Sequence, residues 1–216
     1  MKFRALEPHE IDVRIARCTK GGAYFLLYKD ARCDQSILDE TVGEMGWQRK
    51  HDEHKGNLFC SVGIYDAEKR EWVWKEDAGS ESNTEAEKGH ASDSFKRACF
   101  NWGIGRELYT KINIFVKGIT KEAERKGQGG RTTYELIDPY MKYHVSKIMT
   151  DGQEKKIKYL QVSDKDDVVA FEWWEKAEYK CCVCNKSISQ QIYSKSIAAN
   201  GKPYCSRTCK EKDGAK

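Results

Sequence analysis

Short runs of alternating apolar and polar residues occupy the first part of the chain and predict β-strands. Ala23–Lys29 is apolar on both faces, which favours a buried strand. Residues 47–54 and 58–65 flank Gly56-Asn57, a pair typical of a hairpin turn. In the second of these runs, Leu58, Cys60, Val62 and Ile64 alternate with the residues of the other face. Glu71–Lys75 adds a third strand, with Trp72 and Trp74 on one face that we expect to lie in the core.

An amphipathic helix follows these strands and ends at residue 102. A capping box at residues 84–87 starts it, and Gly103 and Gly105 stop it. Its apolar stripe consists of Ala91, Phe95, Ala98, Cys99 and Trp102. Lys96 and Arg97 lie off this stripe, so the helix buries one side and turns two adjacent cations to the other.

Weaker patterns fill the rest of the chain. Residues 7–17 read as a short helical or turn segment that carries Arg14, and Asp34 is expected to cap a short helix that Gly43 stops. The glycine-rich residues 119–133 favour a mobile loop.

Later runs complete the predicted architecture. Residues 142–148 and 155–162 flank Asp151-Gly152 as a second hairpin, and residues 171–177 close the main domain. The predicted class is α+β, with an antiparallel β-β-β-α core at residues 1–118. A loop and hairpin extension covers residues 119–177, and a small module covers residues 178–216.

Charge is distributed unevenly along the 216 residues, whose formal net charge is +4. Residues 176–216 hold nine Lys and Arg against three acidic residues, a net charge of +6, which leaves −2 for residues 1–175. A nucleic-acid binder of this composition needs a local basic groove rather than a basic surface. No apolar run approaches the roughly 18 residues of a membrane span, and Met1–Glu7 has no hydrophobic signal region. We therefore expect an intracellular, cytoplasmic protein without membrane partners.

Four of the nine cysteines are spaced as metal ligands. Cys181 and Cys184 are separated by two residues, Cys205 and Cys209 by three, and the two pairs lie about twenty residues apart. This arrangement is typical of a structural Zn²⁺ site with no open position for substrate. Cys182 remains an alternative to Cys181. The scattered Cys18, Cys33, Cys60 and Cys99 are interpreted as small buried apolar residues, because an intracellular chain does not favour disulfides.

The helix motif also carries a resemblance. Asp93-Ser-Phe-Lys-Arg-Ala98, followed by Trp102-Gly-Ile-Gly-Arg-Glu-Leu-Tyr109, resembles the hallmark segment of the Rad-fifty-two-type single-strand annealing proteins. Upstream, Pro8, Ile11, Arg14 and Gly46-Trp47 match the opening of that family in order and rough spacing. The resemblance covers about residues 5–115, and the compact phage-encoded branch is the most similar.

The resemblance implies a function. Members of that family bind single-stranded DNA and pair complementary strands without ATP, as rings or filaments of identical subunits. Lys96 and Arg97 match the pair that holds the DNA backbone, Lys88 matches a basic position earlier on the helix, and Arg14 matches the basic residue of the opening segment. The chain has no P-loop pattern, which agrees with a protein that needs no nucleotide.

One position departs from the family pattern. Relatives often carry a basic residue four positions after the lysine of the Lys-Arg pair, where this chain has Phe100. The ring would either stack on a DNA base or fill a subunit interface. Expected partners are single-stranded DNA, further copies of the chain, and a single-strand-binding protein or another recombination protein. A phage protein acting in its host's cytoplasm fits these features.

Three other functions stay open at the level of sequence. A binder that protects single-stranded ends would need the same cations but would not anneal strands. A metal-dependent nuclease could use His51-Asp52-Glu53-His54-Lys55 with Asp66 or Asp77, although charged residues are normal beside a hairpin turn. A zinc-containing adaptor would bind only protein. We expect a DNA-binding protein and not an enzyme.

Overall fold

The computed structural model describes residues 1–79, 86–124, 130, 132–175 and 179–214, without the side chains of residues 86–88 and 190. The chain forms two compact units, Met1–Trp174 and Glu175–Lys216. Within the described residues, every helix is too short or too polar to cross a membrane. The predicted α+β class with antiparallel sheets is confirmed.

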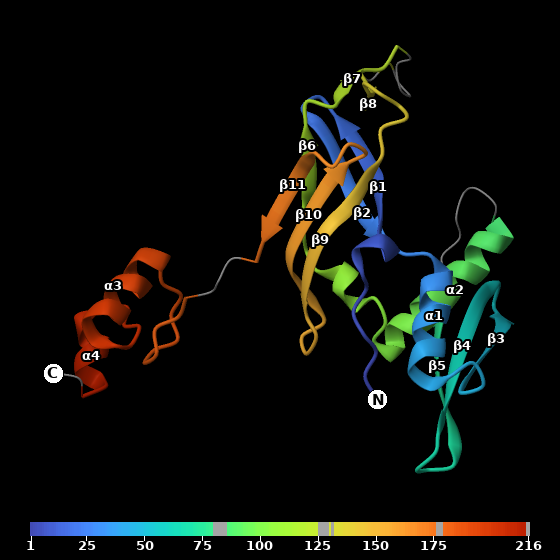
Figure 1. Cartoon of the computed structure of the whole chain (residues 1–216), viewed down its shortest axis with the longest axis horizontal. Helices are drawn as coiled ribbons and strands as arrows, with labels where there is room; N and C mark the ends of the chain where they lie inside the picture. The colour runs from blue at the N-terminus through green and yellow to red at the C-terminus, as the bar shows by residue number, and fades with distance from the viewer. Residues whose placement is uncertain (80–85, 125–129, 131, 176–178, 215–216) are drawn as a thin grey trace. The chain divides into compact units, whose positions relative to one another are not determined.

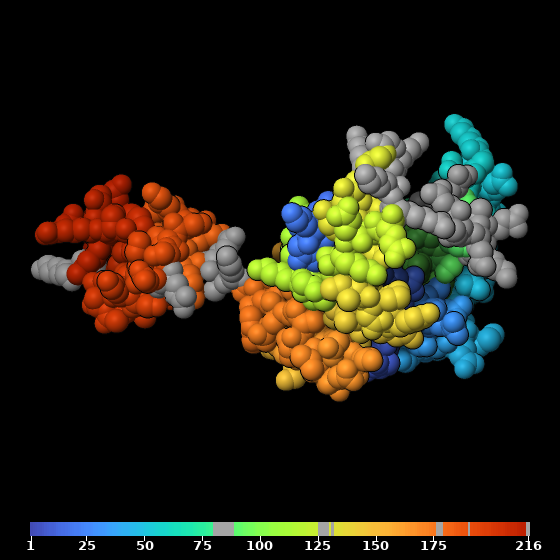
Figure 2. Space-filling view, turned by 90° about the horizontal axis from the view of Figure 1, so that it is seen from above, coloured from blue at the N-terminus to red at the C-terminus, as the bar shows by residue number. Residues whose placement is uncertain are grey.

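A six-stranded antiparallel sheet forms one part of the first unit (Figure 1). Its strands are β1 (Asp12–Thr19), β2 (Gly22–Tyr28), β6 (Ile114–Lys117), β9 (Tyr143–Asp151), β10 (Lys156–Asp164) and β11 (Val169–Trp174), in the order β11-β10-β9-β1-β2-β6. β9 and β10 confirm the second predicted hairpin. β1 and β9 share only the residue pair Asp12 and His144, so this seam joins two three-stranded halves. In the space-filling view, the yellow and orange segments of the first unit lie next to one another (Figure 2).

The predicted β-β-β-α unit forms the other part of the first unit. β3 (Trp47–His54), β4 (Asn57–Asp66) and β5 (Glu71–Ala78) make a three-stranded antiparallel sheet, and α2 (Ala86–Trp102) packs on β4 and β5 (Figure 1). The apolar stripe of α2 faces the sheet, because Phe95, Ala98 and Cys99 are fully buried. Gly103 and Gly105, both with positive φ, follow the last residue of α2 and end the helix as predicted. The proposed capping box lies outside the described residues.

The N-terminal segment differs from the prediction. Only Pro8–Glu10 is helical, as a single 3-10 turn η1, and Arg14 lies on strand β1. Most positions of β1 are exposed, with charged side chains along one face, so its apolar alternation is too weak to mark a strand. Helix α1 (Ala31–Val42) is capped by Asp30, whose side chain accepts a hydrogen bond from the Arg32 amide, and not by Asp34. Gly43 ends α1 as predicted.

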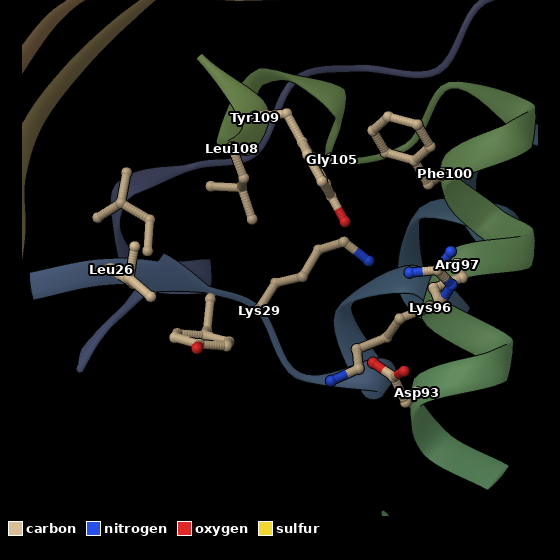
Figure 3. Close-up of a pocket in the computed structure, with 11 residues that line it drawn as sticks. Leu26, Lys29, Asp93, Lys96, Arg97, Phe100, Gly105, Leu108 and Tyr109 are labelled. Carbon is tan, nitrogen blue, oxygen red and sulfur yellow. The ribbon is translucent and has the colours of Figure 1, made fainter. Parts of the chain in front are cut away.

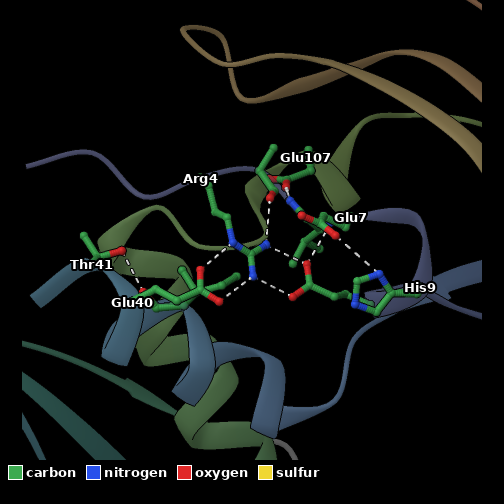
Figure 4. Close-up of polar contacts among 10 residues, drawn as sticks. Arg4, Glu7, His9, Glu40, Thr41 and Glu107 are labelled. Atoms are coloured by element: carbon green, nitrogen blue, oxygen red, sulfur yellow. Dashed lines mark hydrogen bonds and ion pairs between the residues drawn. The ribbon is translucent and has the colours of Figure 1, made fainter. Parts of the chain in front are cut away.

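An ion-pair network ties the N-terminal segment to α1 (Figure 4). The Arg4 guanidinium lies 2.7 Å from a carboxylate oxygen of Glu10 and 2.7 Å from one of Glu40. The hydrogen bonds from Arg4 lower the pKa of Glu10 to about 2 and raise the pKa of Arg4 itself. The segment also reaches the 3-10 turn η2 (Arg106–Tyr109), where the buried Glu107 accepts a hydrogen bond from the Leu6 amide.

Two further expectations are corrected. Trp72 and Trp74 lie on the face of the three-stranded sheet that is opposite to α2, and Trp74 is 40% exposed. Gly63 permits this arrangement, because a Cβ there would lie 2.7 Å from the Trp74 ring. The predicted loop at residues 119–133 contains strand β7 (Thr120–Glu122), which pairs with β8 (Tyr134–Leu136). Residues 125–129 and 131 of that loop lie outside the description.

The second unit is small and has little apolar core. It contains an isolated bridge between Lys180 and Ser187, helix α3 (Gln190–Asn200) and helix α4 (Arg207–Lys212). Its buried cluster consists of Cys181, Tyr204 and Cys209. A unit with so little apolar burial needs another source of stability, and metal binding is the usual one at this size.

Candidate nucleic-acid interface and metal centre

A groove of about 330 Å³ lies between the end of β2 and the side of α2 that carries the predicted cations (Figure 3). Strand β2 and the residue after it contribute Leu26, Tyr28 and Lys29, and α2 contributes Lys96, Arg97 and Phe100. The structure therefore brings three of the predicted DNA-binding residues together in one groove. Lys29, which the sequence interpretation missed, faces them from the opposite wall (Figure 3).

Lys96 and Arg97 are both accessible, with different surroundings. Lys96 is half-buried and has no ion-pair partner among the described residues. Arg97 is 44% exposed at its side chain, and its Nε lies 3.3 Å from Oδ1 of Asp77 on β5. This contact uses Nε alone, so within the described part of the chain both terminal nitrogens of Arg97 stay free to donate to a ligand. Asp93 of α2 also lines the groove, beside these two cations.

Lys29 is held by a buried ion pair with Asp34. Their side chains are 8% and 0% exposed, and the ammonium donates to both carboxylate oxygens of Asp34. Burial raises the pKa of Asp34 to about 6, against the opposing effect of Lys29. Gly105 packs beneath the lysine, because a Cβ at that position would lie 2.4 Å from Lys29 Cε. The pair thus fixes the position of one wall of the groove, and its opposite charges largely cancel.

Phe100 lies on the groove side of α2, away from the apolar stripe. Its ring centroid is 4.5 Å from that of Tyr109, and the Arg106 guanidinium lies 5.4 Å from the Phe100 centroid. Tyr109 is 68% exposed, so this aromatic pair offers ring surface at one end of the groove. Cations beside accessible rings can hold phosphates and unstacked bases at the same time.

Arg14 lies at the edge of the groove. Its guanidinium is 5.3 Å from the ring centroid of the groove residue Tyr28 and 2.7 Å from a carboxylate oxygen of Asp12. Arg14 is exposed on the sheet face that also carries Leu26, its partner across β1 and β2. Lys88, the remaining candidate, belongs to α2, but its side chain lies outside the description.

Four thiols in the second unit form a group that can hold one metal ion. The ligand atoms of Cys181, Cys184, Cys205 and Cys209 all lie within 4.8 Å of one another. The Sγ atoms of Cys184 and Cys205 are 3.5 Å apart, and those of Cys205 and Cys209 are 3.4 Å apart. Tetrahedral zinc with Zn–S bonds of about 2.3 Å requires sulfur separations of about 3.8 Å, close to these distances. Cys182 is exposed and is not part of the group.

The surroundings of these thiols favour a bound cation. The backbone amides of Cys184 and Val183 donate to Cys181 and lower the pKa of its thiol to about 6. A hydrogen bond with the neighbouring Cys205 sulfur raises the pKa of Cys209 to about 12, so this thiol resists ionisation while Cys181 favours it. A divalent cation removes this conflict and lets all four sulfurs bind as thiolates.

The scattered cysteines are buried to different degrees. Cys60 and Cys99 are fully buried as predicted, and burial raises the pKa of the Cys60 thiol to about 11. Cys18 and Cys33 are half-buried. The His51–Lys55 segment runs from β3 into its turn, and all five residues are exposed. Among the described residues, only the four-thiol group brings three or more potential metal ligands together.

No protein-family model matches the chain, and a search of curated proteins finds no significant match.

Proposed function

We propose that this protein binds single-stranded DNA in the groove between β2 and α2 and anneals complementary strands without ATP. The observation that carries the proposal is the convergence of Lys96, Arg97 and Phe100 on one groove that Lys29 faces from the other wall. The order of three strands followed by a long helix and a double-glycine exit also agrees with the annealing-protein resemblance.

Backbone contacts would dominate such binding. Lys96 and the terminal nitrogens of Arg97 would hold phosphates, while Phe100 and Tyr109 would contact bases at roughly 1–3 kcal/mol per base. Arg14 and Lys88 would extend the contact beyond the groove. Annealing requires that base edges remain free to pair, so a grip on phosphates and ring faces suits it. Further copies of the chain would bring a second strand close.

The second unit would hold a structural Zn²⁺ on its four thiolates. Four protein ligands leave no coordination position for a substrate, so the ion would stabilise the fold rather than react. We propose a DNA-binding protein and not an enzyme, acting in the cytoplasm on intracellular DNA.

The test is the annealing of complementary oligonucleotides in the absence of ATP. Fluorescence quenching reports how fast the two strands pair. Wild-type protein should accelerate annealing, and Lys96→Ala/Arg97→Ala should lose most of the acceleration. Lys111→Ala/Lys147→Ala serves as control, because it removes the same charge from exposed positions outside the groove. Wild-type protein that does not accelerate annealing, or a groove variant that matches the control, contradicts the proposal.

Binding without acceleration would instead favour the end-protecting binder. That alternative needs the same cations, so gel retardation would respond to the groove substitutions while annealing would stay at its spontaneous rate. A protein that retards no oligonucleotide in a gel at low salt would be neither an annealing protein nor an end-protecting binder.

A further inference from the structure

The second unit contains a basic hollow that the proposed groove does not explain. It measures about 340 Å³ and lies between α3 and α4. Ile192 and Lys195 line it from α3, and Arg207 and Lys210 line it from α4. Cys205 of the four-thiol group forms part of its wall, so a bound metal would fix the position of the hollow.

Two of its cations form no ion pair within the described part of the chain. Lys195 is exposed and Lys210 is half-buried, and neither forms an ion pair with any residue that the structure describes. Arg207 is 91% exposed at its side chain and is oriented by Glu211, whose carboxylate oxygen lies 2.9 Å from Nε. The positive charge around the hollow is therefore available to a ligand.

The nearby carboxylates contact other side chains of the unit, and one of them offsets the charge of Arg207. Glu211 contacts Arg207, and Asp213 accepts from Lys202 at 2.8 Å and from the Tyr204 hydroxyl at 2.7 Å. Neither carboxylate lines the hollow. An anion that enters it would therefore meet Lys195 and Lys210 without an acidic side chain in the wall.

Compensation of the metal centre does not account for this charge. Zinc bound by four thiolates carries a net charge of −2. Residues 176–216 have a formal charge of +6. Two of these positive charges would neutralise the metal centre, which leaves a net charge of +4. The cations exceed what the metal centre needs.

The shape of the hollow selects a ligand with both anionic and apolar parts. Lys195 lies one helical turn after Ile192, and Lys210 lies one turn after Arg207, so each helix presents two of these side chains on one face. Ile192 is 44% exposed and supplies an apolar surface beside the ammonium groups. A nucleotide strand offers phosphate to the cations and a sugar or base to the apolar wall.

We infer that this hollow binds the phosphodiester backbone of single-stranded DNA, as a second contact on the same strand that the groove holds. The inference rests on the proposed function for the identity of its ligand. Because both units belong to one chain, a strand bound in the groove is at high local concentration for the hollow. Two contacts of modest strength then give tighter binding than either one alone.

The experiment uses the full-length, zinc-loaded protein and a fluorescently labelled oligothymidylate. Affinity is measured by anisotropy between about 50 and 200 mM KCl for Lys195→Ala/Lys210→Ala. The matched control is Lys186→Ala/Lys212→Ala, which removes two exposed lysines from the same unit outside the hollow. Zinc content of each variant verifies that the unit is intact.

We expect the hollow variant to reduce the steepness of log K against log salt by about 1.4, which is about 0.7 for each lost phosphate contact. The control should keep the wild-type slope. Equal slopes in the hollow variant and the control overturn the inference.

A quadruple variant that combines Lys195→Ala/Lys210→Ala with Lys96→Ala/Arg97→Ala distinguishes the contribution of the hollow from that of the groove. Residual binding of the groove variant that disappears with the hollow substitutions supports the hollow even if the groove fails. Binding that depends on the groove alone overturns the hollow and leaves the proposed function standing. Wild-type protein that does not bind the oligonucleotide overturns both.

Discussion

Asp77 on β5 holds Arg97 of α2 through a single contact, 3.3 Å between Oδ1 and Nε. The carboxylate also accepts from the Ala78 amide, so its position is fixed by the strand that carries it. It offsets part of the positive charge that the groove presents. Asp77 therefore limits how strongly Arg97 can attract a phosphate.

Removal of that carboxylate charge should strengthen DNA binding. Asp77→Asn keeps the size of the side chain, and we expect the affinity for single-stranded DNA to rise about 2- to 5-fold at low salt. The affinity is measured by fluorescence anisotropy with a labelled oligonucleotide. Asp66→Asn serves as control because it removes an acidic charge from the far end of the same sheet. Unchanged or weaker binding by Asp77→Asn would show that Arg97 does not contact DNA.

Gly105 is expected to be intolerant of a side chain. It has a φ of +70°, and a Cβ would lie 2.4 Å from Lys29 Cε. Gly105→Ala should lower the free energy of unfolding by about 2–3 kcal/mol, measured by urea denaturation. Gly118→Ala isolates the contact, since Gly118 has a similar φ of +73° and open space around it, and should lose only about 1 kcal/mol. Equal losses would mean that Lys29 moves aside freely.

The Arg4–Glu10 pair predicts a pH dependence of stability. The pKa of Glu10 is lowered from 4.5 to about 2, so its contribution is present above about pH 4.5 and is lost as pH falls through about 2. Arg4 is one-third exposed, and solvent screening reduces this contribution to about 1–2 kcal/mol. Denaturation at pH 7 and pH 3 should show a smaller acid loss for Glu10→Gln than for wild type. A loss as large as in wild type would contradict the assignment.

Zinc removal should unfold the second unit and leave the first intact. The buried cluster of the second unit is small, whereas the first unit has an extensive core that includes both of its larger sheets. Chelation should abolish amide dispersion for residues after 179 in NMR spectra while earlier signals persist. Cys184→Ser should lose zinc, and Cys182→Ser, whose thiol is exposed outside the group, should retain one ion per chain. Equal zinc content in both variants would contradict the ligand set.

The elements with strong periodicity could be predicted from sequence. The alternating apolar residues of β4 and the stripe of α2 are both buried, and side chains that share a buried face leave a clear pattern in the sequence. The spacing of Cys181, Cys184, Cys205 and Cys209 likewise placed four thiols in one group, because local turns bring each pair together.

The missed features depend on long-range packing. β1 carries charged side chains along an exposed face, so only its pairing with β2 identifies it as a strand. Trp72 and Trp74 are as apolar as core residues, and their side of the sheet depends on where α2 lies. Lys29 could have been suspected as a groove residue only from the position of Gly105, which is distant in sequence and close in space.

The single residue pair between β1 and β9 has a mechanical consequence. Each half of the six-stranded sheet is secured by its own ladder of hydrogen bonds, while Asp12 and His144 alone link the ladders. The relative orientation of the two halves therefore depends on side-chain packing across the seam, such as that of Phe25 of β2 against Tyr143 of β9. Arg14 lies two residues from this joint, so the same packing sets where its guanidinium lies beside the groove residue Tyr28.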